Sequence, residues 1–224
     1  MSLAGEPQIR GEINIMAKTE PYDQFAHRYD DWFSQNPQIY ESELEAVRRM
    51  IPPEGIGIEI GVGTGRFSGP LGVRLGVEPS GPMREVARER GIAVVSGVGE
   101  ALPLTSGLFD FVLMVTVLCF LDDVEGTLRE IHRILKPSGE AVIGFIDRDT
   151  PVGKTYEERK MDSLYYRKAN FLSAREVIVH LKEAGFETFT FAQTIFRTKG
   201  ATDGTEKVRE GYGDGCFAVV KAAK

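Results

Sequence analysis

A hydrophobic segment, a glycine turn and a carboxylate occur together at residues 58–67, which read Ile-Glu-Ile-Gly-Val-Gly-Thr-Gly-Arg-Phe. The three glycines, at positions 61, 63 and 65, allow positive φ angles and a close approach of the backbone to a ligand. A helix that begins after such a turn offers unpaired N–H groups to the same ligand. This pattern indicates a strand, a turn and a helix start that bind a cofactor containing adenosine.

Spacing and charge narrow the choice of cofactor. A dinucleotide fingerprint has glycine at its first, third and sixth positions, and the sixth position counted from Gly61 is Arg66. A long side chain there would obstruct helix-strand packing beside a pyrophosphate. Glu59 would also repel a pyrophosphate, but it would suit a ligand that carries an ammonium group and a sulfonium. S-adenosylmethionine carries both groups, so we predict this cofactor.

Size and composition exclude several other classes of protein. The 224 residues are 42% hydrophobic, enough for one large α/β domain with a sizeable core. The net charge of −6 leaves no general attraction for nucleic acid. Cys119 and Cys216 lie beside apolar neighbours and predict buried thiols. No apolar run is long enough to span a bilayer, and residues 1–20 predict a loosely ordered leader, so we expect a cytoplasmic protein without a membrane partner.

Strands and helices are predicted to alternate along most of the chain, which is typical of a parallel sheet covered on both faces. Short apolar strands are expected at 56–60, 73–77, 92–95, 111–115 and 141–146. Helices are expected at 82–90 and 124–135, with Lys136-Pro-Ser-Gly139 as the turn that ends the second one.

The pattern changes after the fifth predicted strand. Residues 147–172 mix charges with aromatic side chains and predict a lid over a site. Ser173 and Glu176 form a capping box for a helix that ends at Gly185. Two further strands, at 186–195 and 215–220, are expected to close the sheet, with residues 197–213 as a long loop between them.

With its elements in this order, the chain from about Tyr22 onward resembles the class I S-adenosylmethionine-dependent methyltransferases. The resemblance is greatest to the small-molecule branch that includes the ubiquinone and menaquinone biosynthesis enzymes. Residues 59–65 match the first family motif, and Glu78, at the end of the second strand, matches the second. The resemblance implies that Glu78 accepts hydrogen bonds from both ribose hydroxyls, and that Met83 packs against adenine.

Further motifs of the family occur along the chain in the expected order. Residues 99–103 resemble the adenine loop, 109–116 the fourth strand, and 128–139 the helix and turn before the fifth strand, although Ser138 stands where the family commonly has glycine. The resemblance implies a single domain over residues 21–224, with a helical cap at about 21–51. It also implies a Rossmann-like, doubly wound sheet of seven strands in the order 3-2-1-4-5-7-6, one of them antiparallel, with helices on both faces.

Two sets of site residues follow from these motifs. The predicted cofactor-binding residues are Glu59, Gly61, Val62, Gly63, Gly65, Glu78, Pro79, Met83, Gly99, Glu100, Ala101, Thr116 and Tyr29, the last from the N-terminal helix that the family places over the cofactor. The predicted acceptor-binding residues are Tyr22, Phe33, Phe120, Asp147, Tyr166 and Phe171.

Simpler roles remain open for several of these side chains. The aromatic residues at 25, 29, 32 and 33 follow helical spacing and could form a packed structural face. Asp147 could be a polar residue that keeps its loop in contact with solvent, and the position of Cys119 is better explained by packing in the core. The three histidines show no ligand spacing, so we predict no metal site.

The residues favour methyl transfer to a small molecule by in-line displacement, with S-adenosylhomocysteine as the product. Positioning and exclusion of water can supply much of that acceleration, so no catalytic residue is named. The nucleophile could be oxygen, nitrogen, sulfur or carbon. A non-catalytic S-adenosylmethionine-binding protein is an alternative, and an NAD(P)-dependent oxidoreductase is a third that Arg66 and Glu59 oppose. The protein could be a monomer or a homodimer.

Overall fold

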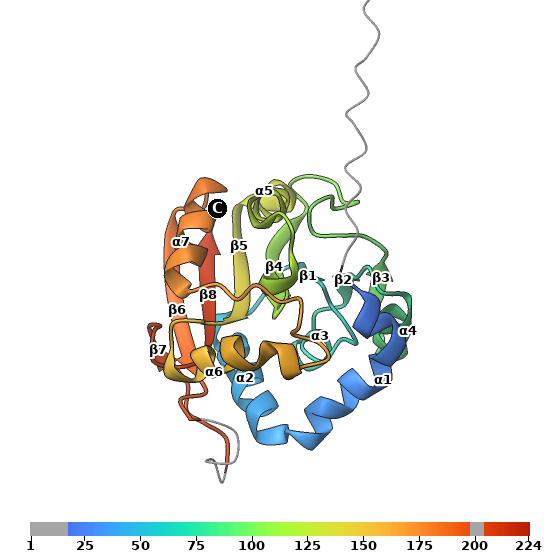
Figure 1. The fold of residues 1–224 in the computed structure, drawn as a ribbon. Helices are drawn as coiled ribbons and strands as arrows, with labels where there is room; N and C mark the ends of the chain where they lie inside the picture. Colours follow the sequence, from blue (N-terminus) through green and yellow to red (C-terminus); the bar gives the residue numbers. More distant parts are fainter. Residues whose placement is uncertain (1–17, 198–203) are drawn as a thin grey trace, which may run out of the picture.

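A single sheet of eight strands forms the centre of the computed structural model, which describes residues 18–197 and 204–224. The strand order is β3-β2-β1-β4-β5-β8-β6-β7 (Figure 1). The strands are β1 (Gly57–Ile60), β2 (Leu75–Val77), β3 (Ala93–Val95), β4 (Phe109–Val115), β5 (Leu135–Ile146), β6 (Thr188–Thr194), β7 (Arg209–Glu210) and β8 (Phe217–Ala223). Among the described residues, the predicted order of seven strands is confirmed, with one strand added at the edge.

The added strand is β7, which pairs antiparallel with β6 through two residues. It lies inside the segment predicted as a loop, 197–213, of which residues 198–203 lie outside the described residues. Strands β1 to β5 pair in parallel, whereas β8 runs antiparallel to both β5 and β6. This is the antiparallel strand that the family resemblance implied.

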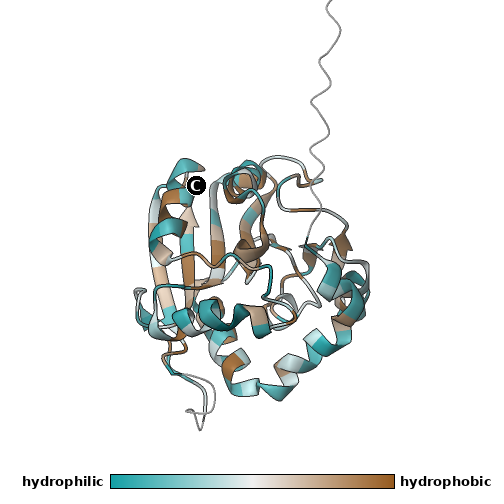
Figure 2. Ribbon diagram, viewed as in Figure 1, coloured by the Kyte–Doolittle hydropathy of each residue, from teal (hydrophilic) through white to brown (hydrophobic). Residues whose placement is uncertain are grey.

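Helices cover both faces of the sheet, as predicted. They are α1 (Glu20–Gln35), α2 (Pro37–Met50), α3 (Ser68–Leu71), α4 (Gly81–Glu89), α5 (Val124–Ile134), α6 (Pro151–Arg159) and α7 (Ala174–Glu183), with 3-10 turns η1 (Leu118–Phe120) and η2 (Lys160–Asp162). Alternate residues of β4 enter different cores: Val112 and Met114 pack with α5 and α7, whereas Phe111 and Leu113 pack with α2. Figure 2 shows the hydrophobic residues along these strands and the hydrophilic ones along much of α1.

The turn predicted at residues 136–139 takes a different form. Leu135 pairs with Phe109 and Glu140 pairs with Phe111, so the intervening residues bulge out within β5 and do not precede it. The helix before the bulge ends at Ile134, where predicted to within one residue. Leu135 is fully buried, and its burial against β4 starts the strand earlier than the glycine and proline at the turn suggested.

The helix expected after the glycine turn is also shorter than the motif suggests. α3 has four residues, and Gly72, with φ of 75°, ends it. By contrast, α7 carries the predicted capping box, in which Ser173 and Glu176 bond each other's backbone N–H groups.

The ends of the parallel strands are covered by helices from distant parts of the sequence. In Figure 1, α1, α2 and α6 gather at the edge where these strands end. α6 and η2 occupy the segment predicted as a lid, and α1 and α2 the segment predicted as a helical cap. The leader predicted for residues 1–20 falls largely outside the described residues; Lys18 and Thr19 lead directly into α1. Within the described ranges, no helix has the length and apolar character needed to cross a membrane.

Candidate active site

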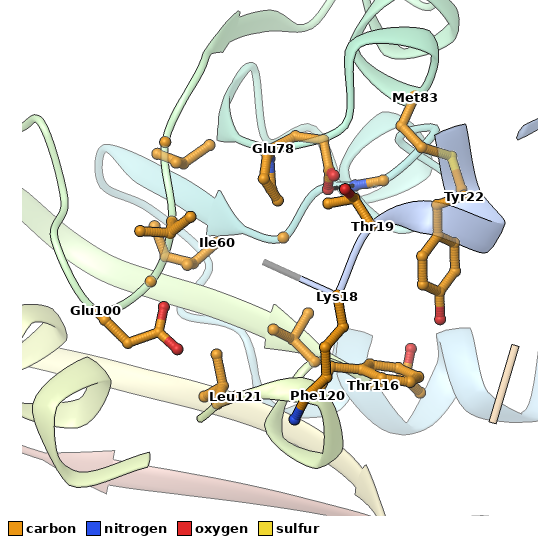
Figure 3. Close-up of a pocket in the computed structure, with 18 of the residues that line it drawn as sticks. Lys18, Thr19, Tyr22, Ile60, Glu78, Met83, Glu100, Thr116, Phe120 and Leu121 are labelled. Carbon is orange, nitrogen blue, oxygen red and sulfur yellow. Dashed lines mark hydrogen bonds between the residues drawn. The ribbon is translucent and has the colours of Figure 1, made fainter. Parts of the chain in front are cut away.

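A first cavity of about 120 Å³ lies at the carboxyl ends of β1, β2 and β4. This edge, where strand order reverses, is the usual ligand site of doubly wound sheets. Figure 3 shows Glu78 and Met83 on one side of the cavity, with Phe120 and Leu121 across from them. Of the predicted cofactor residues, those that line it are Gly61, Gly63, Glu78, Pro79, Met83, Gly99, Glu100, Thr116 and Tyr29.

Glu78 is the buried carboxylate of this cavity. One of its oxygens accepts a hydrogen bond from the Gly63 N–H at 2.9 Å, and the other accepts one from the Ser80 N–H at 2.9 Å. Burial raises the pKa of Glu78, and these two N–H groups oppose that rise. Each oxygen keeps a lone pair for a further donor. Glu78 is therefore held rigidly at the end of β2 with its acceptor capacity only half used.

The remaining predicted cofactor residues do not line the cavity. Glu59 is buried and accepts a hydrogen bond from the Ser68 hydroxyl of α3, and burial raises its pKa to about 8. Val62 packs in a small core beneath the glycine turn, and a Cβ at Gly65 would collide with Ile92 of the same core. Ala101 forms a bridge to Val98. The structure therefore gives these four positions a supporting place behind the cavity wall.

Helix α1 is fastened to the glycine turn by the carboxylate of Asp30. This side chain accepts hydrogen bonds from the hydroxyl of Thr64 at 2.7 Å, from Arg66 at 2.6 and 2.8 Å, and from Arg90 at 2.7 Å. Burial alone would raise the pKa of Asp30, but the hydrogen bonds from Arg66, Arg90 and Thr64 hold it well below its usual range. Arg66, which argued against a dinucleotide, thus joins the turn to α1.

A second cavity, of about 630 Å³, lies beside the first. Residues from α1, α2, α6, η2 and the end of β6 line it, and many of them are aromatic: Tyr29, Trp32, Phe33, Phe67, Tyr156, Tyr165 and Tyr166. Its volume lies within the range of roughly 300–1,000 Å³ that small-molecule sites occupy. This cavity can hold a compound with a substantial apolar body.

The two cavities share Tyr29 and Thr116. Thr116 has a φ of 55°, which is a strained conformation for a β-branched residue. Its N–H donates to the Gly144 carbonyl at 2.8 Å, and this bond to β5 helps to hold the turn. Burial raises the pKa of the Tyr29 hydroxyl, which therefore stays protonated and available as a donor. A strained threonine and a protonated tyrosine hydroxyl thus mark the junction of the cavities.

The predicted acceptor residues divide between the cavities. Phe33 and Tyr166 line the second, and Tyr22 and Phe120 line the first. Edge-to-face contacts of Tyr22 with Tyr29 and Phe120, at 5.4 and 5.7 Å between centroids, connect these walls. The aromatic face of α1 is therefore both a packed face and a cavity wall.

Asp147 and Phe171, two other predicted acceptor residues, line neither cavity. The Asp147 carboxylate accepts N–H bonds from Asp149 and from Ala174 at the start of α7. The Phe171 ring is buried behind Tyr156 and Tyr166. In the structure the Asp147 carboxylate thus satisfies backbone donors at the end of β5, and Phe171 anchors the lid segment in the core, so their roles in acceptor binding stay predictions.

Glu43 of α2 was not predicted as a site residue, yet it lines the second cavity. No hydrogen bond or ion pair joins it to another of the described residues, and burial raises its pKa to about 8. A signal for it exists in the sequence. Tyr40, Glu43, Val47 and Met50 follow helical spacing, so a glutamate interrupts an otherwise apolar stripe.

Lys18 and Asp122 are further residues of the first cavity that sequence reasoning missed. They form an ion pair of 2.7 Å at its rim. Figure 3 shows the Lys18 side chain near Phe120 and Leu121. Lys18 stands in a stretch without regular structure, and Asp122 follows η1. No motif in either place indicated that the two would meet.

Away from both cavities, Glu125, His180 and Glu183 bring possible metal ligands within 4.8 Å of one another. They belong to α5 and α7, and Glu183 is exposed, as acidic surface groups commonly are. Our prediction of no metal site stays a prediction. The two cysteines are both buried and free, as expected, and burial raises the pKa of Cys119 to about 12.

The first cavity has the chemistry of a site for the adenosyl part of S-adenosylmethionine. Glu78 can accept hydroxyl groups, Met83 offers a buried apolar surface, and the backbone at Gly63 faces open space. Lys18 and Tyr22, from the segment that begins α1, line the cavity as well.

Known proteins with similar sequences and structures agree with this chemistry. The family described as a methyltransferase domain matches residues 58–143. An uncharacterised protein of Methanocaldococcus jannaschii is 48% identical over 203 residues, which cover 91% of this chain and 98% of that protein. A crystal structure from Thermotoga maritima, of an S-adenosylmethionine-dependent methyltransferase described as a possible histamine N-methyltransferase, has a TM-score of 0.89 and 45% identity, covering 92% of this chain and 99% of the other.

The quinone branch is represented by a more distant relative. The 2-phytyl-1,4-naphthoquinone methyltransferase of Nostoc punctiforme is 25% identical over 176 residues, covering 71% of this chain and 75% of that enzyme. The likeness to this branch is weaker than the likeness to the proteins of M. jannaschii and T. maritima.

Proposed function

Because this chain belongs to the class I S-adenosylmethionine-dependent methyltransferases, we propose that it transfers the methyl group of its cofactor to a small molecule bound in the second cavity. The observation that carries the acceptor assignment is the junction of the two cavities at Tyr29 and Thr116. The first cavity has the hydrogen-bond acceptors that a nucleoside needs, and the second is large and aromatic. At the junction, the methyl group of a cofactor in the first cavity could meet the nucleophile of a compound in the second.

The residues around the first cavity would hold the cofactor. Glu78 would accept its ribose hydroxyls, Met83 would pack against adenine, and the backbone at Gly61 and Gly63 would line the rest. When bound, S-adenosylmethionine supplies a methyl group on a positively charged sulfur, which departs as a neutral thioether. The glutamate and the glycine turn would keep this end of the ligand in one position.

The protein's contribution to the reaction would be positioning and exclusion of water. Tyr29 and Thr116 form the wall that both ligands would touch, and α1, α6 and η2 cover the second cavity. The strained Thr116 is held by its bond to β5 and defines one side of the path between the sites. A fixed wall of this kind favours an in-line approach of the acceptor to the methyl carbon.

Calorimetric titration with S-adenosylhomocysteine tests the cofactor site. We expect saturable binding that weakens roughly 10- to 100-fold in Glu78→Gln, because a hydrogen bond to a charged group contributes about 1.5–3 kcal/mol. Glu89→Gln, an exposed glutamate at the end of the neighbouring helix α4, is the matched control and should bind normally. Equal affinities of the wild type and Glu78→Gln would contradict the proposed site.

Turnover is tested with methyl-labelled S-adenosylmethionine and a fractionated metabolite extract. Labelled small molecules identified by mass spectrometry are the expected result. Binding of S-adenosylhomocysteine without any labelled product would instead support the non-catalytic alternative.

A further inference from the structure

Glu43 is an unpaired acid in an aromatic cavity. It lies on the face of α2 that packs toward the sheet, between Tyr40 and Val47 in the helical stripe. Burial raises the pKa of Tyr29, Tyr156 and Cys216, and the nearby Glu43 carboxylate adds to each rise, so Glu43 is close to side chains from three other segments. Glu43 is half-buried and lines the cavity with no donor from the described residues. A ligand with a positively charged donor would supply the missing partner.

The other charged residues of the second cavity already have partners. Lys160 contacts Glu157 at 2.6 Å, and Arg159 lies 3.8 Å from Asp162. Arg197 lies 3.8 Å from Glu206. Arg159, Asp162 and Arg197 are also mostly exposed, so they belong to the mouth of the cavity. Among the described acidic and basic residues that line the cavity, Glu43 is thus the one without a partner.

The aromatic walls favour the same kind of ligand. The rings of Trp32, Tyr156 and Tyr166 line the same cavity as Glu43, and aromatic faces attract an ammonium group. An anionic ligand would meet a like charge or an acid that must stay protonated, and the cation Lys160, among the described residues of the wall, is already paired with Glu157. A neutral alcohol would gain one hydrogen bond and no ion pair.

We propose that Glu43 binds the amino group of the methyl acceptor, and that the acceptor is a primary or secondary amine carried on an apolar body. This inference rests on the proposed function and names the substrate class of its second cavity. It assigns to Glu43 a role in both recognition and proton transfer.

The proton transfer follows from the chemistry of amines. An ammonium ion has no lone pair and cannot attack a methyl group, so it must first give a proton to a base. The ionised Glu43 takes that proton, and the neutral amine remains. The nitrogen lone pair then forms the bond to the methyl carbon as the carbon–sulfur bond breaks and its electron pair stays on sulfur. The product is an N-methylammonium ion, and Glu43 keeps the proton it took, which restores the acid form of the free protein.

The same groups predict a measurable release of protons. Burial raises the pKa of Glu43 to about 8, so the free protein holds a carboxylic acid at pH 7. A free alkylamine at this pH carries its own extra proton. When they are apart, the carboxylic acid and the ammonium ion each hold one dissociable proton. In the complex only one of these two protons remains, either on the carboxyl group or on the nitrogen. One proton is therefore released for each amine that binds.

The test uses calorimetric titration of the protein saturated with S-adenosylhomocysteine. The probes are 2-phenylethylamine and tryptamine, each compared with its neutral alcohol, 2-phenylethanol or tryptophol. Measurements at pH 7 in two buffers of different ionisation enthalpy give the number of protons released. Glu43→Gln keeps the shape of the side chain and removes the acid. Glu41→Gln, an exposed residue of the same helix, is the matched control.

We expect at least one amine to bind the wild type and Glu41→Gln at least tenfold more tightly than its alcohol, with about one proton released. In Glu43→Gln the affinity should fall at least tenfold and the proton release should disappear, while affinity for S-adenosylhomocysteine is unchanged. The proposal is overturned if no amine binds, if amine and alcohol bind alike, or if Glu43→Gln binds and releases protons as the wild type does. Failure of the proposed function has another signature, the absence of binding by S-adenosylhomocysteine itself.

Discussion

The attachment of α1 to the glycine turn depends on Asp30, and its removal should cost a large part of the protein's stability. Asp30 accepts four side-chain hydrogen bonds from Thr64, Arg66 and Arg90, all between 2.6 and 2.8 Å. A hydrogen bond to a charged group contributes about 1.5–3 kcal/mol. The two arginines are only 23% and 29% exposed, but they can still reach water when their partner is lost. Solvent screening therefore reduces the sum, and we expect Asp30→Ala to cost about 2–4 kcal/mol.

The pH dependence of this loss gives a second check. The pKa of Asp30 is held well below its usual range, so its contribution is fully present above the unfolded carboxyl pKa of about 3.9. It is lost as the pH falls from there through the folded pKa. The stability difference between the wild type and Asp30→Ala should therefore be largest near pH 7 and smaller at pH 3.

Urea unfolding followed by circular dichroism measures both effects. Asp31→Ala is the matched control, because Asp31 is exposed, adjacent in sequence and outside these hydrogen bonds; its effect should stay within about 0.5 kcal/mol. The reasoning is refuted if Asp30→Ala costs less than about 0.5 kcal/mol, or if the difference from the wild type does not change between pH 7 and pH 3.

Two more predictions concern the turn and the strand before it. Gly61→Ala should lower the melting temperature more than Gly72→Ala: both glycines have positive φ, but only at Gly61 would a Cβ collide with another side chain, that of Val117. Equal melting temperatures would show that the collision is relieved without cost. Burial raises the pKa of Glu59 to about 8, so its contribution to stability is full below about pH 4 and is lost as the pH rises through 8. In the ligand-free protein, Glu59→Gln should therefore flatten the decline in melting temperature between pH 5 and 9, and an unchanged slope would argue against a buried neutral acid.

The parts of the fold that could be predicted are those that follow from local periodicity. The first four strands were located within two residues because each is a short apolar run between turn residues. The capping box of α7 was read directly from Ser173 and Glu176. The bulge in β5 and the edge strand β7 could not be predicted, because both depend on which residues face them across the sheet. Lys136-Pro-Ser-Gly139 has the composition of a turn, and only the pairing of Leu135 with Phe109 makes it a bulge.

The candidate cofactor site was more predictable than the acceptor site for a related reason. Glu78, Met83 and Gly99 stand at fixed positions after successive strands, and the ends of those strands meet at one edge of the sheet. Some predicted residues, such as Asp147, line no cavity. Their position after a strand is typical of ligand-binding residues, but the end of a strand also exposes backbone N–H groups that need an acceptor. A carboxylate serves either need, and the sequence alone does not separate them.

The second cavity combines segments whose distance the sequence does not encode. Trp32 and Glu43 come from two helices near the start of the chain, Tyr156 and Tyr166 from the lid, and Ile195 from the end of β6. Ile195 has a φ of 62°, so the chain is strained here as it is at Thr116. Since both strained β-branched residues border this cavity, the backbone is held there against its own preference by the packing around it. Packing from α1, α2, α6 and η2 thus fixes the wall on which the proposed binding of an amine depends.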